Sequence, residues 1–458
     1  MDNDILYKEE AREIEVIENV DVLIAGGGCA GVIAAIASAR TGARTILVER
    51  YGFLGGTITA GMLLSLSSFC DRFNPYAENW TPSNPNAPSH LIISGIPLEF
   101  MENVKRERGT ILGNEPEEAY WNPVDPEVVK LVAQEMVLEA GVKLLFHSLI
   151  VDVIKDGNEL KGIIIESKSG RQAIRAKIIV DATGDGDVYS RAGAQYEKGD
   201  AEGKFMPVSM LFRLGGVRVP KYPAIFNCDP LETHVLREGA MKGKHNLKQL
   251  RLWVHSLPVK DQVWINGTRI ANVDGTDIYD LTKAEIKGRR QVWNLYRFLK
   301  ENLDTYRESY ILSTACQVAI RETRRLIGKY ILTAEDILND HEFDDAICRG
   351  SYPIDIHLSD GSGVKLTYRE GGTSYTIPYR CLLPLEVENL LVAGRSISVT
   401  REALGSMRVV SICMATGHAA GIAAALSINN NVTPRNLDVK LLQYTLKSQG
   451  AILENPKD

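Results

Sequence analysis

The sequence predicts an α/β fold in which a parallel-sheet domain is interrupted by an inserted α+β domain. Three observations lead to this: a strand–turn–helix–strand unit near the amino end, a buried-strand pattern that returns near residue 390, and a change of composition between them. With 458 residues and 45% hydrophobic side chains, the chain is long enough for two hydrophobic cores. We assign residues 1–200 and 374–458 to the first domain and residues 201–373 to the inserted domain.

The amino-terminal unit supplies the first observation. Asp21–Ala25 is an apolar strand pattern, Gly26–Gly31 is a glycine-rich turn, Val32–Arg40 has the small residues of a packed helix, and Thr45–Glu49 is a second strand pattern. Strand, turn, helix and strand in this order predict a βαβ unit with two parallel strands.

Later elements extend the sheet and return to it. Asp125 and Pro126 are typical of a helix start, and we expect that helix to end near Gly141. The other expected elements are strands at 142–153, 160–167, 178–184 and 389–394 and an Ala/Gly-rich helix at 409–428. Residues 74–89, rich in Pro and Asn, have the composition of a long loop and a possible lid.

Composition and charge narrow the class of protein. The 52 basic and 58 acidic residues give a net charge of −6, so no overall positive field favours nucleic acid or anionic lipid. The first 20 residues lack the apolar core of a signal peptide, and we expect a soluble, cytoplasmic protein without a membrane span. Seven scattered cysteines with no C-x-x-C spacing suggest neither disulfides nor a metal site.

The turn Gly26-x-Gly28-x-x-Gly31 has the spacing of a dinucleotide-binding motif. Its glycines suit a tight turn, a close approach to a pyrophosphate and close packing of helix on strand, and the phosphate meets the positive end of the helix. Glu49 follows Gly31 by 18 residues and ends the second strand, where a carboxylate can accept hydrogen bonds from adenosine ribose hydroxyls. Its negative charge disfavours the 2′-phosphate of NADP.

The segment after Glu49 bears on the choice between NAD and FAD. Arg50–Thr57 is a second glycine-rich loop, which suits a longer cofactor, whereas NAD dehydrogenases usually continue directly into further βα units. Here the sequence resembles the large FAD-binding superfamily that includes glutathione reductase and the fumarate reductase flavoproteins. The resemblance implies FAD as the cofactor and a Rossmann-like FAD-binding domain of the glutathione reductase type.

Two further segments carry the resemblance. Val180–Asp187 is similar to the superfamily's second motif, a strand ending in Ala-Thr-Gly, and Leu391–Arg395 with Ala403–Arg408 is similar to its third. The third motif would line the ribityl chain and aim a helix N-terminus at the flavin's pyrimidine end, where reduced flavin carries negative charge. The chain also resembles a bacterial group called FAD-dependent oxidoreductases, on the segments Leu54–Thr57, Ala182–Asp187, Ile320–Arg325 and Pro378–Pro384.

The resemblance implies a set of cofactor-binding residues. Those at the pyrophosphate would be Gly26, Gly28, Cys29, Ala30 and Gly31, with Glu49 at the ribose and Val151 at the adenine. Those around the ribityl and flavin ends would be Gly55, Gly56, Gly394, Arg395, Ser406, Met407 and Arg408, and the predicted site is completed by Arg50, Thr57, Ala182, Thr183, Gly184 and Asp187. Arg395 stands where many relatives carry an acid that binds a ribityl hydroxyl, which puts that contact in question.

Three residues are candidates for catalysis. If residues 321–325 are helical, Arg321 shares a face with Arg325 and can bind a carboxylate, although such clusters are more often surface salt bridges. His357 alternates with apolar residues and can move a proton, or it is a structural histidine. Arg401 precedes the segment that the superfamily places beside the flavin. Cys316 and Cys381 are expected to serve packing.

The expected function is hydride transfer between flavin N5 and a small polar organic substrate, with an electron donor or acceptor that the sequence does not identify. A dehydrogenase and a reductase are both compatible with it. Three alternatives remain open at this point: a flavoprotein that modifies RNA or another macromolecule, a non-catalytic nucleotide-binding protein, and an NAD-only dehydrogenase.

Overall fold

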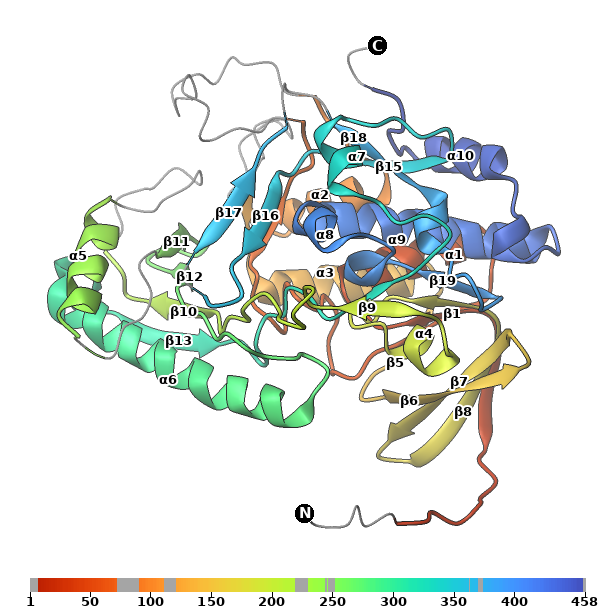
Figure 1. Ribbon diagram of the computed structural model, residues 1–458, viewed down its shortest axis with the longest axis horizontal. Coiled ribbons are helices and arrows are strands. Elements are labelled where there is room, and N and C mark those ends of the chain that lie inside the picture. Colours follow the sequence, from red (N-terminus) through yellow and green to blue (C-terminus); the bar gives the residue numbers. More distant parts are fainter. Residues whose placement is uncertain are drawn as a thin grey trace.

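A computed structural model describes residues 7–71, 90–110, 121–218, 230–243, 245, 252–361, 363–369 and 374–455. The loop expected at 74–89 and Cys228 lie outside these ranges. Figure 1 shows a helix-covered sheet on the right and a smaller sheet with its own helices on the left. This arrangement is the α/β fold with an inserted domain that the sequence predicts.

The main sheet has a parallel core. Its strands run in the order β5 (Lys143–Leu145), β2 (Thr45–Val48), β1 (Val16–Ala25) and β8 (Gly170–Asp181), and β19 (Leu390–Val392) pairs with β8. Every one of these pairings is parallel. Buried parallel strands need apolar residues on both faces, which explains the apolar runs in the sequence.

The strand β8 has two partners along one edge. Its first half pairs antiparallel with β7 (Glu159–Ser167), which pairs with β6 (Leu149–Asp156), and its last residues pair with β19. The single strand expected at 142–153 is wrong, because β5 and β6 lie at opposite ends of the sheet. The chain turns between them at His147, whose φ of +53° lies in the left-handed region.

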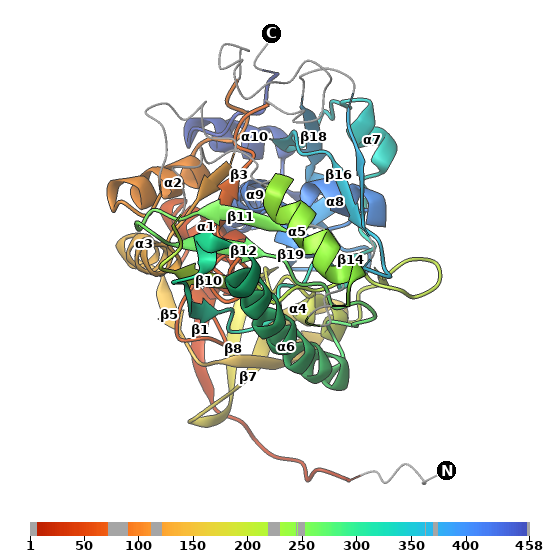
Figure 2. The ribbon, with the colours of Figure 1, turned by 90° about the vertical axis from the view of Figure 1, so that its left-hand side faces the viewer.

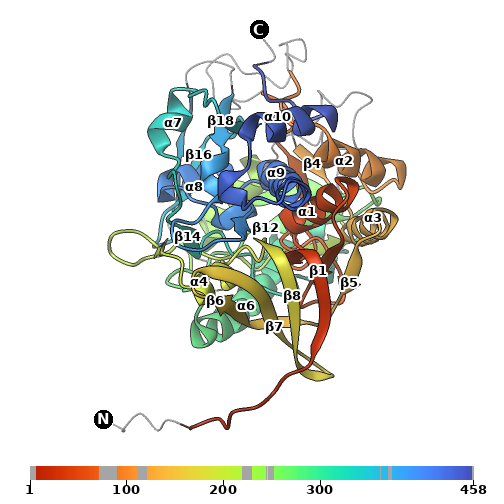
Figure 3. The same ribbon diagram turned by 90° about the vertical axis from the view of Figure 1, so that its right-hand side faces the viewer.

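Two helices cover one face of the sheet in close contact, as Figure 3 shows: α1 (Cys29–Arg40) and α9 (Val410–Asn429). A Cβ built on Gly417 or Gly421 of α9 would lie 2.2 Å from a carbonyl oxygen of α1, so only glycine permits this spacing. In length and composition α9 matches a membrane span, but 94% of its most apolar window is buried inside the protein. The Ala/Gly-rich helix expected at 409–428 is therefore confirmed as a core helix.

Two other helices border this layer, α2 (Ile96–Arg106) and α3 (Pro126–Glu139). The side chain of Asp125 caps α3 by accepting a hydrogen bond from Glu127 N at 2.8 Å, as the sequence indicates. The last helix, α10 (Val439–Ser448), packs beside α9.

The inserted domain is a four-stranded sheet with helices, seen face-on in Figure 2. Its strands run in the order β11 (Trp253–Ser256), β12 (Val263–Asn266), β10 (Phe212–Gly215) and β13 (Tyr310–Thr314), all antiparallel. The long helix α6 (Ile278–Asn302) buries Val292, Leu295 and Phe298, and α5 (Pro230–Met241) lies at the outer end.

The segment after the inserted sheet returns to the first domain. In it, β15 (Ala346–Gly350) pairs with β18 (Tyr375–Pro378) and contacts α9, so the predicted boundary at 373 separates two paired strands. The hairpin of β16 (Ile354–His357) and β17 (Val364–Thr367) places β16 beside α8 (Arg401–Met407). This segment thus connects both domains.

Two local expectations are corrected here. Residues 324–326 form the strand β14 (Arg324–Leu326), paired with β9 (Tyr196–Lys198), so Arg321 and Arg325 do not share a helix face. The segment 403–408 was expected as a loop, but it lies in α8 and its C-cap Arg408, and Thr400 caps that helix with a hydrogen bond from Ala403 N.

Candidate functional site

The parallel strands end level with one another at one edge of the sheet. Ala25 is in register with Val48 and with Asp181, and Asp181 is in register with Val392. Because ligands of open parallel sheets bind at the carboxyl ends of the strands, the residues that follow are placed to form a site. Those residues are Gly26, Glu49, Ala182 and Ala393, and all of them line one cleft.

This cleft has an empty volume of about 1170 Å³, including the part open to solvent. The predicted residues that line it are Gly26, Gly28, Cys29, Ala30, Glu49, Arg50, Gly56, Thr57, Ala182, Thr183, Gly184, Arg321, Gly394, Arg395 and Arg408. A smaller hollow of about 400 Å³ shares Gly26, Glu49, Arg50 and Thr183 with the cleft and adds Asp187. The two together form one extended depression of the kind that a dinucleotide requires.

Glycines Gly26, Gly28, Gly31, Gly55 and Gly56 form what we call the glycine cradle. A Cβ on Gly31 would lie 1.9 Å from Gly26 O, and one on Gly26, with φ +96°, would lie 2.7 Å from Ala182 O. A Cβ on Gly28, in contrast, meets only Gly56 Cα at 3.9 Å. The protein itself therefore leaves the space at Gly28 open, as close approach of a pyrophosphate requires.

The two glycine-rich loops contact each other in the cradle. Gly55 N donates to Gly27 O at 2.9 Å, and a Cβ on Gly56 would lie 2.7 Å from Gly28 Cα. Gly31 and Gly55 do not line the cleft, so their role is to bring its walls together.

The N-terminus of α1 opens onto the cleft at Cys29 and Ala30. Its N-cap, Gly28, offers no side-chain acceptor, and the first turn contains no acid. The exposed N–H groups and the helix dipole at this end are suited to a phosphate anion. The backbone here fits the pyrophosphate of FAD.

Glu49 is fixed at the end of β2 with only 7% of its surface exposed. Its Oε2 accepts from Gly27 N at 2.7 Å and its Oε1 accepts from Tyr51 N at 2.9 Å. Burial raises the pKa of Glu49, and the two backbone hydrogen bonds oppose that rise. A carboxylate offers about four acceptor sites. The remaining ones are free for ribose hydroxyls.

Val151 lies on a β-bulge. The register between β6 and β7 shifts between Ile150 and Asp152, which leaves Val151 out of the ladder. Its carbonyl accepts from Arg191 Nε at 3.0 Å. The smaller hollow is lined by Ser148, Leu149 and Ile150 but not by Val151, so the expected adenine contact stays a prediction.

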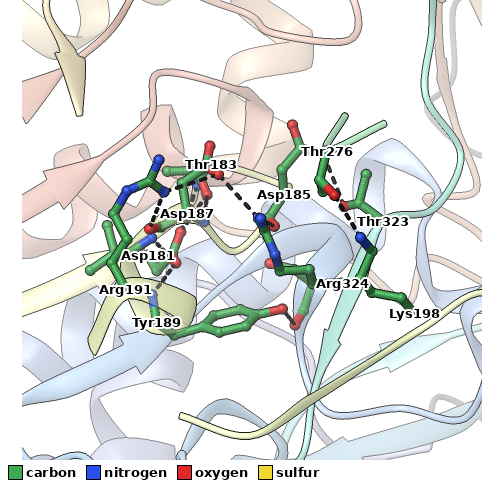
Figure 4. Close-up of polar contacts among 12 residues, drawn as sticks. Asp181, Thr183, Asp185, Asp187, Tyr189, Arg191, Lys198, Thr276, Thr323 and Arg324 are labelled. Carbon is green, nitrogen blue, oxygen red and sulfur yellow. Dashed lines mark hydrogen bonds and ion pairs between the residues drawn. The ribbon is translucent and has the colours of Figure 1, made fainter. Parts of the chain in front are cut away.

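The loop after β8 is held by the buried carboxylate of Asp181, as Figure 4 shows. Its two oxygens accept from Thr183 N, Thr183 Oγ1, Val188 N and Tyr189 N at 2.6–3.0 Å. Burial raises the pKa of Asp181, and the hydrogen bonds from Thr183 and Tyr189 counteract it. This carboxylate positions the Ala-Thr-Gly segment that lines the cleft.

Arg395 carries its own acidic partner. Arg395 Nη2 donates to Asp185 Oδ1 at 2.6 Å, and Thr323 Oγ1 donates to the same oxygen at 3.0 Å. Asp185 lines the cleft but was not among the predicted residues, although it directly follows Gly184 in the second motif. An acidic side chain, absent at position 395 itself, is therefore supplied by Asp185 in the loop after β8.

Arg321, Arg408 and His357 converge on one group, although they are far apart in the sequence. We call Arg269, Arg321 and Arg408, together with Asp355 and His357, the arginine cluster. Arg321 and Arg408 line the cleft, and His357 lies behind them with Nε2 3.5 Å from Asp355 Oδ2. Arg269 and Asp355 were not predicted, and no local pattern marks them.

Arg401, Ser406 and Met407 do not line the cleft. Arg401 donates to both carboxylate oxygens of Glu322 at 3.2–3.3 Å, and the Glu322 side chain is fully buried. Ser406 and Met407 are buried in α8, where the Ser406 hydroxyl lies 2.7 Å from the Tyr375 hydroxyl. The local contacts of these three residues belong to packing around α8.

The cysteines divide into two groups. Cys29 from α1 and Cys413 from α9 both line the cleft, a pairing that their separation in sequence hides. Cys381 is completely buried, which agrees with a packing role, whereas Cys316 is exposed.

Several proteins of known name are similar to part of this chain. The thiamine thiazole synthases of Aeropyrum pernix and Methanococcus vannielii are 28% and 30% identical over 190 and 187 residues, 38% and 39% of this chain and 58% and 60% of theirs. The digeranylgeranylglycerophospholipid reductase of Picrophilus torridus is 25% identical over 181 residues, 38% of this chain and 41% of that protein. The chain thus spans less than two thirds of the length of each of these relatives.

Solved structures with low sequence identity also align. The p-nitrophenol 4-monooxygenase of Pseudomonas putida DLL-E4 is 12% identical with a TM-score of 0.48, over 97% of this chain and 91% of that one. A geranylgeranyl bacteriochlorophyll reductase-like protein of Thermoplasma acidophilum is 15% identical with a TM-score of 0.46, over 94% and 83%.

The family comparison covers almost the whole chain. The family described as FAD dependent oxidoreductase matches residues 21–446, which include the glycine cradle, Glu49, the loop after β8 and all of α9. This match to an FAD-dependent family excludes the alternative of an NAD-only dehydrogenase. The protein belongs to the FAD dependent oxidoreductase family, and its cofactor is FAD.

Proposed function

We propose that this protein is a dehydrogenase or reductase that moves a hydride between flavin N5 and a small polar organic molecule. The main observation in support of this proposal is that residues of both domains line one cleft. The first domain contributes Gly26, Gly28 and Gly56 of the glycine cradle together with Glu49, and the inserted region contributes Leu211, Asn266 and Arg321. A cofactor held by the first set would have a substrate-sized space against the second.

The side chains of the cleft favour binding and orientation. FAD supplies the two-electron chemistry, and the protein needs to hold the substrate, exclude water and manage a proton. Arg321 is 9% exposed and lines the cleft, so it can hold a polar substrate group away from bulk water. The apolar neighbours Leu211, Ala319 and Ile320 restrict solvent around it.

His357 is better suited to hydrogen bonding than to proton transfer. Burial lowers the pKa of His357 to about 3, and the positive charge of Arg321 lowers it further, against the opposing effect of Asp355. A group with this pKa is neutral near pH 7 and a weak base. We therefore assign it to the support of the arginine cluster.

The proposal is tested by the visible spectrum of the purified protein and by anaerobic mixing with substrate panels. We expect a yellow protein that releases FAD on denaturation and whose flavin is bleached by at least one member of a panel of alcohols, sugars, amines and acids. In the reductase direction, dithionite-reduced enzyme would instead be reoxidised anaerobically by an unsaturated acid or a carbonyl compound.

The alternatives give different results. A non-catalytic FAD-binding protein would show neither bleaching nor substrate-dependent reoxidation. A macromolecule-modifying flavoprotein would ignore the small-molecule panels but change its flavin spectrum with RNA or a protein partner. Either result would contradict the proposal.

A further inference from the structure

We infer that the substrate carries a carboxylate or a similar anionic group, and that Arg321 binds it with electrostatic support from Arg269 and Arg408. This inference rests on the proposed function, because it concerns the substrate of the same cleft. It goes further by naming the chemical class of the group that is bound and the residues that select it.

The first observation is that two guanidinium groups share one hydroxyl. Arg321 Nη1 donates to Ser209 Oγ at 3.1 Å, and Arg269 Nη1 donates to the same oxygen at 3.2 Å. Ser209 is completely buried. The fold therefore holds two like charges side by side where little water screens them.

The second observation is an excess of positive charge. Arg408 Nη2 adds a third guanidinium, bonded to Asp355 O at 3.1 Å and Oδ2 at 3.4 Å. Three guanidiniums face one carboxylate, Asp355, and His357 is neutral, which leaves a formal excess of two positive charges.

Burial and the repulsion between neighbouring guanidiniums both lower the pKa values of Arg321 and Arg269. Burial, followed by the charges of Arg269 and Arg408, holds the pKa of Arg321 well below its usual range, and burial lowers the pKa of Arg269 to about 10. Arginine side chains stay protonated in proteins near pH 7, so the repulsion persists. An anion in the cleft would relieve it.

The third observation concerns unused hydrogen-bonding groups. Among the described residues, acceptors contact only Nη1 of Arg321, namely Pro207 O and Ser209 Oγ. Three further polar atoms of the arginine cluster are buried and have no hydrogen-bond partner among the described residues: Arg408 Nε, His357 Nδ1 and Asp355 Oδ1. Buried polar groups are normally satisfied, so these atoms indicate a bound ligand or ordered water.

A carboxylate fits the unused donors of Arg321 and Arg408 better than a neutral group does, whereas Asp355 Oδ1 is an acceptor and needs a donor such as ordered water. The unused Nε and Nη2 donors of Arg321 form a fork that matches two carboxylate oxygens, and the charge of the ligand offsets the local excess. Reduced flavin is a competing source of negative charge, because it carries charge near N1 and O2. The oxidised ring system is neutral, so the two sources are separated by working with oxidised enzyme.

The test titrates the oxidised holoenzyme with malonate, succinate and benzoate, and with the neutral analogues malonamide, succinamide and benzamide. Binding is followed by the change in the visible flavin spectrum and by equilibrium dialysis. We expect at least one acid to bind at least tenfold more tightly than its amide. Arg321→Gln should remove that preference, Arg321→Lys should retain part of it, and FAD content should stay unchanged in both.

A matched control is Arg307→Gln. Arg307 is an exposed arginine of the inserted region that pairs with Asp304, and its loss should leave the acid preference intact. If Arg321→Gln fails to fold, the comparison of acids with amides on the unmodified protein still tests the anionic class of the substrate, and Arg321→Lys tests the role of Arg321.

Equal binding of acids and amides, or no binding of either, would overturn the inference. An acid preference that survives in Arg321→Gln would also overturn it. The proposed function fails separately: a protein that binds acids through Arg321 but exchanges electrons with no substrate keeps the anion site and loses the assigned chemistry. Conversely, bleaching by an uncharged substrate without acid binding keeps the chemistry and removes the anion site.

Discussion

The glycine cradle and the arginine cluster both contribute residues to the same cleft but are built in opposite ways. The cradle depends on missing side chains: a Cβ at Gly31 would lie 1.9 Å from a carbonyl oxygen, whereas at Gly28 the space is left open. The cluster depends on charged side chains drawn from positions 269, 321, 355 and 408, with the neutral His357 beside them. The shape of the cradle is therefore determined by backbone geometry, whereas the properties of the cluster are determined by charges that come from distant positions in the sequence.

The difference teaches how each region should respond to change. A substitution in the cradle acts sterically, with the outcome set by which atom a new Cβ meets. A substitution in the cluster acts through charge balance, so a conservative cation preserves part of the effect. The predictions below apply the same distinction between steric and electrostatic effects to single residues of the chain, from the largest expected effect to the smallest.

Gly28→Val should abolish FAD binding while leaving the fold intact. The new Cβ meets only Gly56 Cα at 3.9 Å inside the protein, so the branched side chain extends from it into the space that a pyrophosphate needs. The measurement is the ratio of visible to ultraviolet absorbance after purification, with far-ultraviolet circular dichroism as the test of folding.

Gly363→Ala is the matched control for this change. Its Cβ would lie 3.6 Å from Leu358 Cδ1, an ordinary contact, and Gly363 has no left-handed φ. It should keep FAD and stability. A Gly28→Val protein with a full complement of FAD would show that the pyrophosphate lies elsewhere.

Arg401→Ala should destabilise the protein by roughly 3 kcal/mol, because it removes a partner from the fully buried Glu322. Arg325 Nη1 lies 3.7 Å from Glu322 and limits the loss. The expected observation is a lower midpoint of thermal unfolding with nearly normal flavin reduction by substrate. Normal stability with slowed flavin reduction would instead return Arg401 to the substrate-binding residues.

Glu49→Gln should weaken FAD binding by about 2 kcal/mol, through loss of charge-assisted hydrogen bonds to the ribose. A glutamine retains one of the two acceptor oxygens that now receive Gly27 N and Tyr51 N. The measurement is FAD affinity by fluorescence titration of apoprotein. The FAD-saturated variant should react at a nearly normal rate, and an unchanged affinity would remove Glu49 from the binding site.

Asp21→Asn, outside both regions, should cost only about 1 kcal/mol, because its partners Arg44 and Lys177 are 69% and 62% exposed. The hydrogen bond from Arg44, and then Lys177, lowers the pKa of Asp21 to about 2. Because the pKa of Asp21 is lower in the folded protein than the unfolded value of about 3.9, the ionised carboxylate stabilises the fold at pH values above about 3.9. That stabilisation is lost as the pH falls toward about 2.

The measurement is thermal unfolding of both proteins between about pH 7 and pH 3. The difference between them should be largest near neutrality and shrink with acid. A difference that grows on acidification would mean that the Asp21 pKa is raised instead.

The sequence by itself determined the βαβ unit, the glycine turn at 26–31 and Glu49, because a tight turn, a helix start and a strand end are local backbone requirements. The FAD cofactor followed from the resemblance to a flavoprotein superfamily and not from a local pattern. The long helix expected at 409–428 was also predictable, because its small residues are continuous. The same local reasoning failed at 142–153, where one strand pattern is divided by a turn at His147.

Only the tertiary structure decided which arginines face the cleft. Arg321 and Arg401 look alike in sequence, yet one lines the cleft and the other is bonded to the buried Glu322. A helix at residues 321–325 would have placed Arg321 and Arg325 on one face, but residues 324–326 form the strand β14, where Arg325 donates to Gly199 O. The environment of a charge is set by neighbours that the fold brings together from more than 50 residues away, such as Ser209 and Arg269 beside Arg321, and no local pattern encodes them.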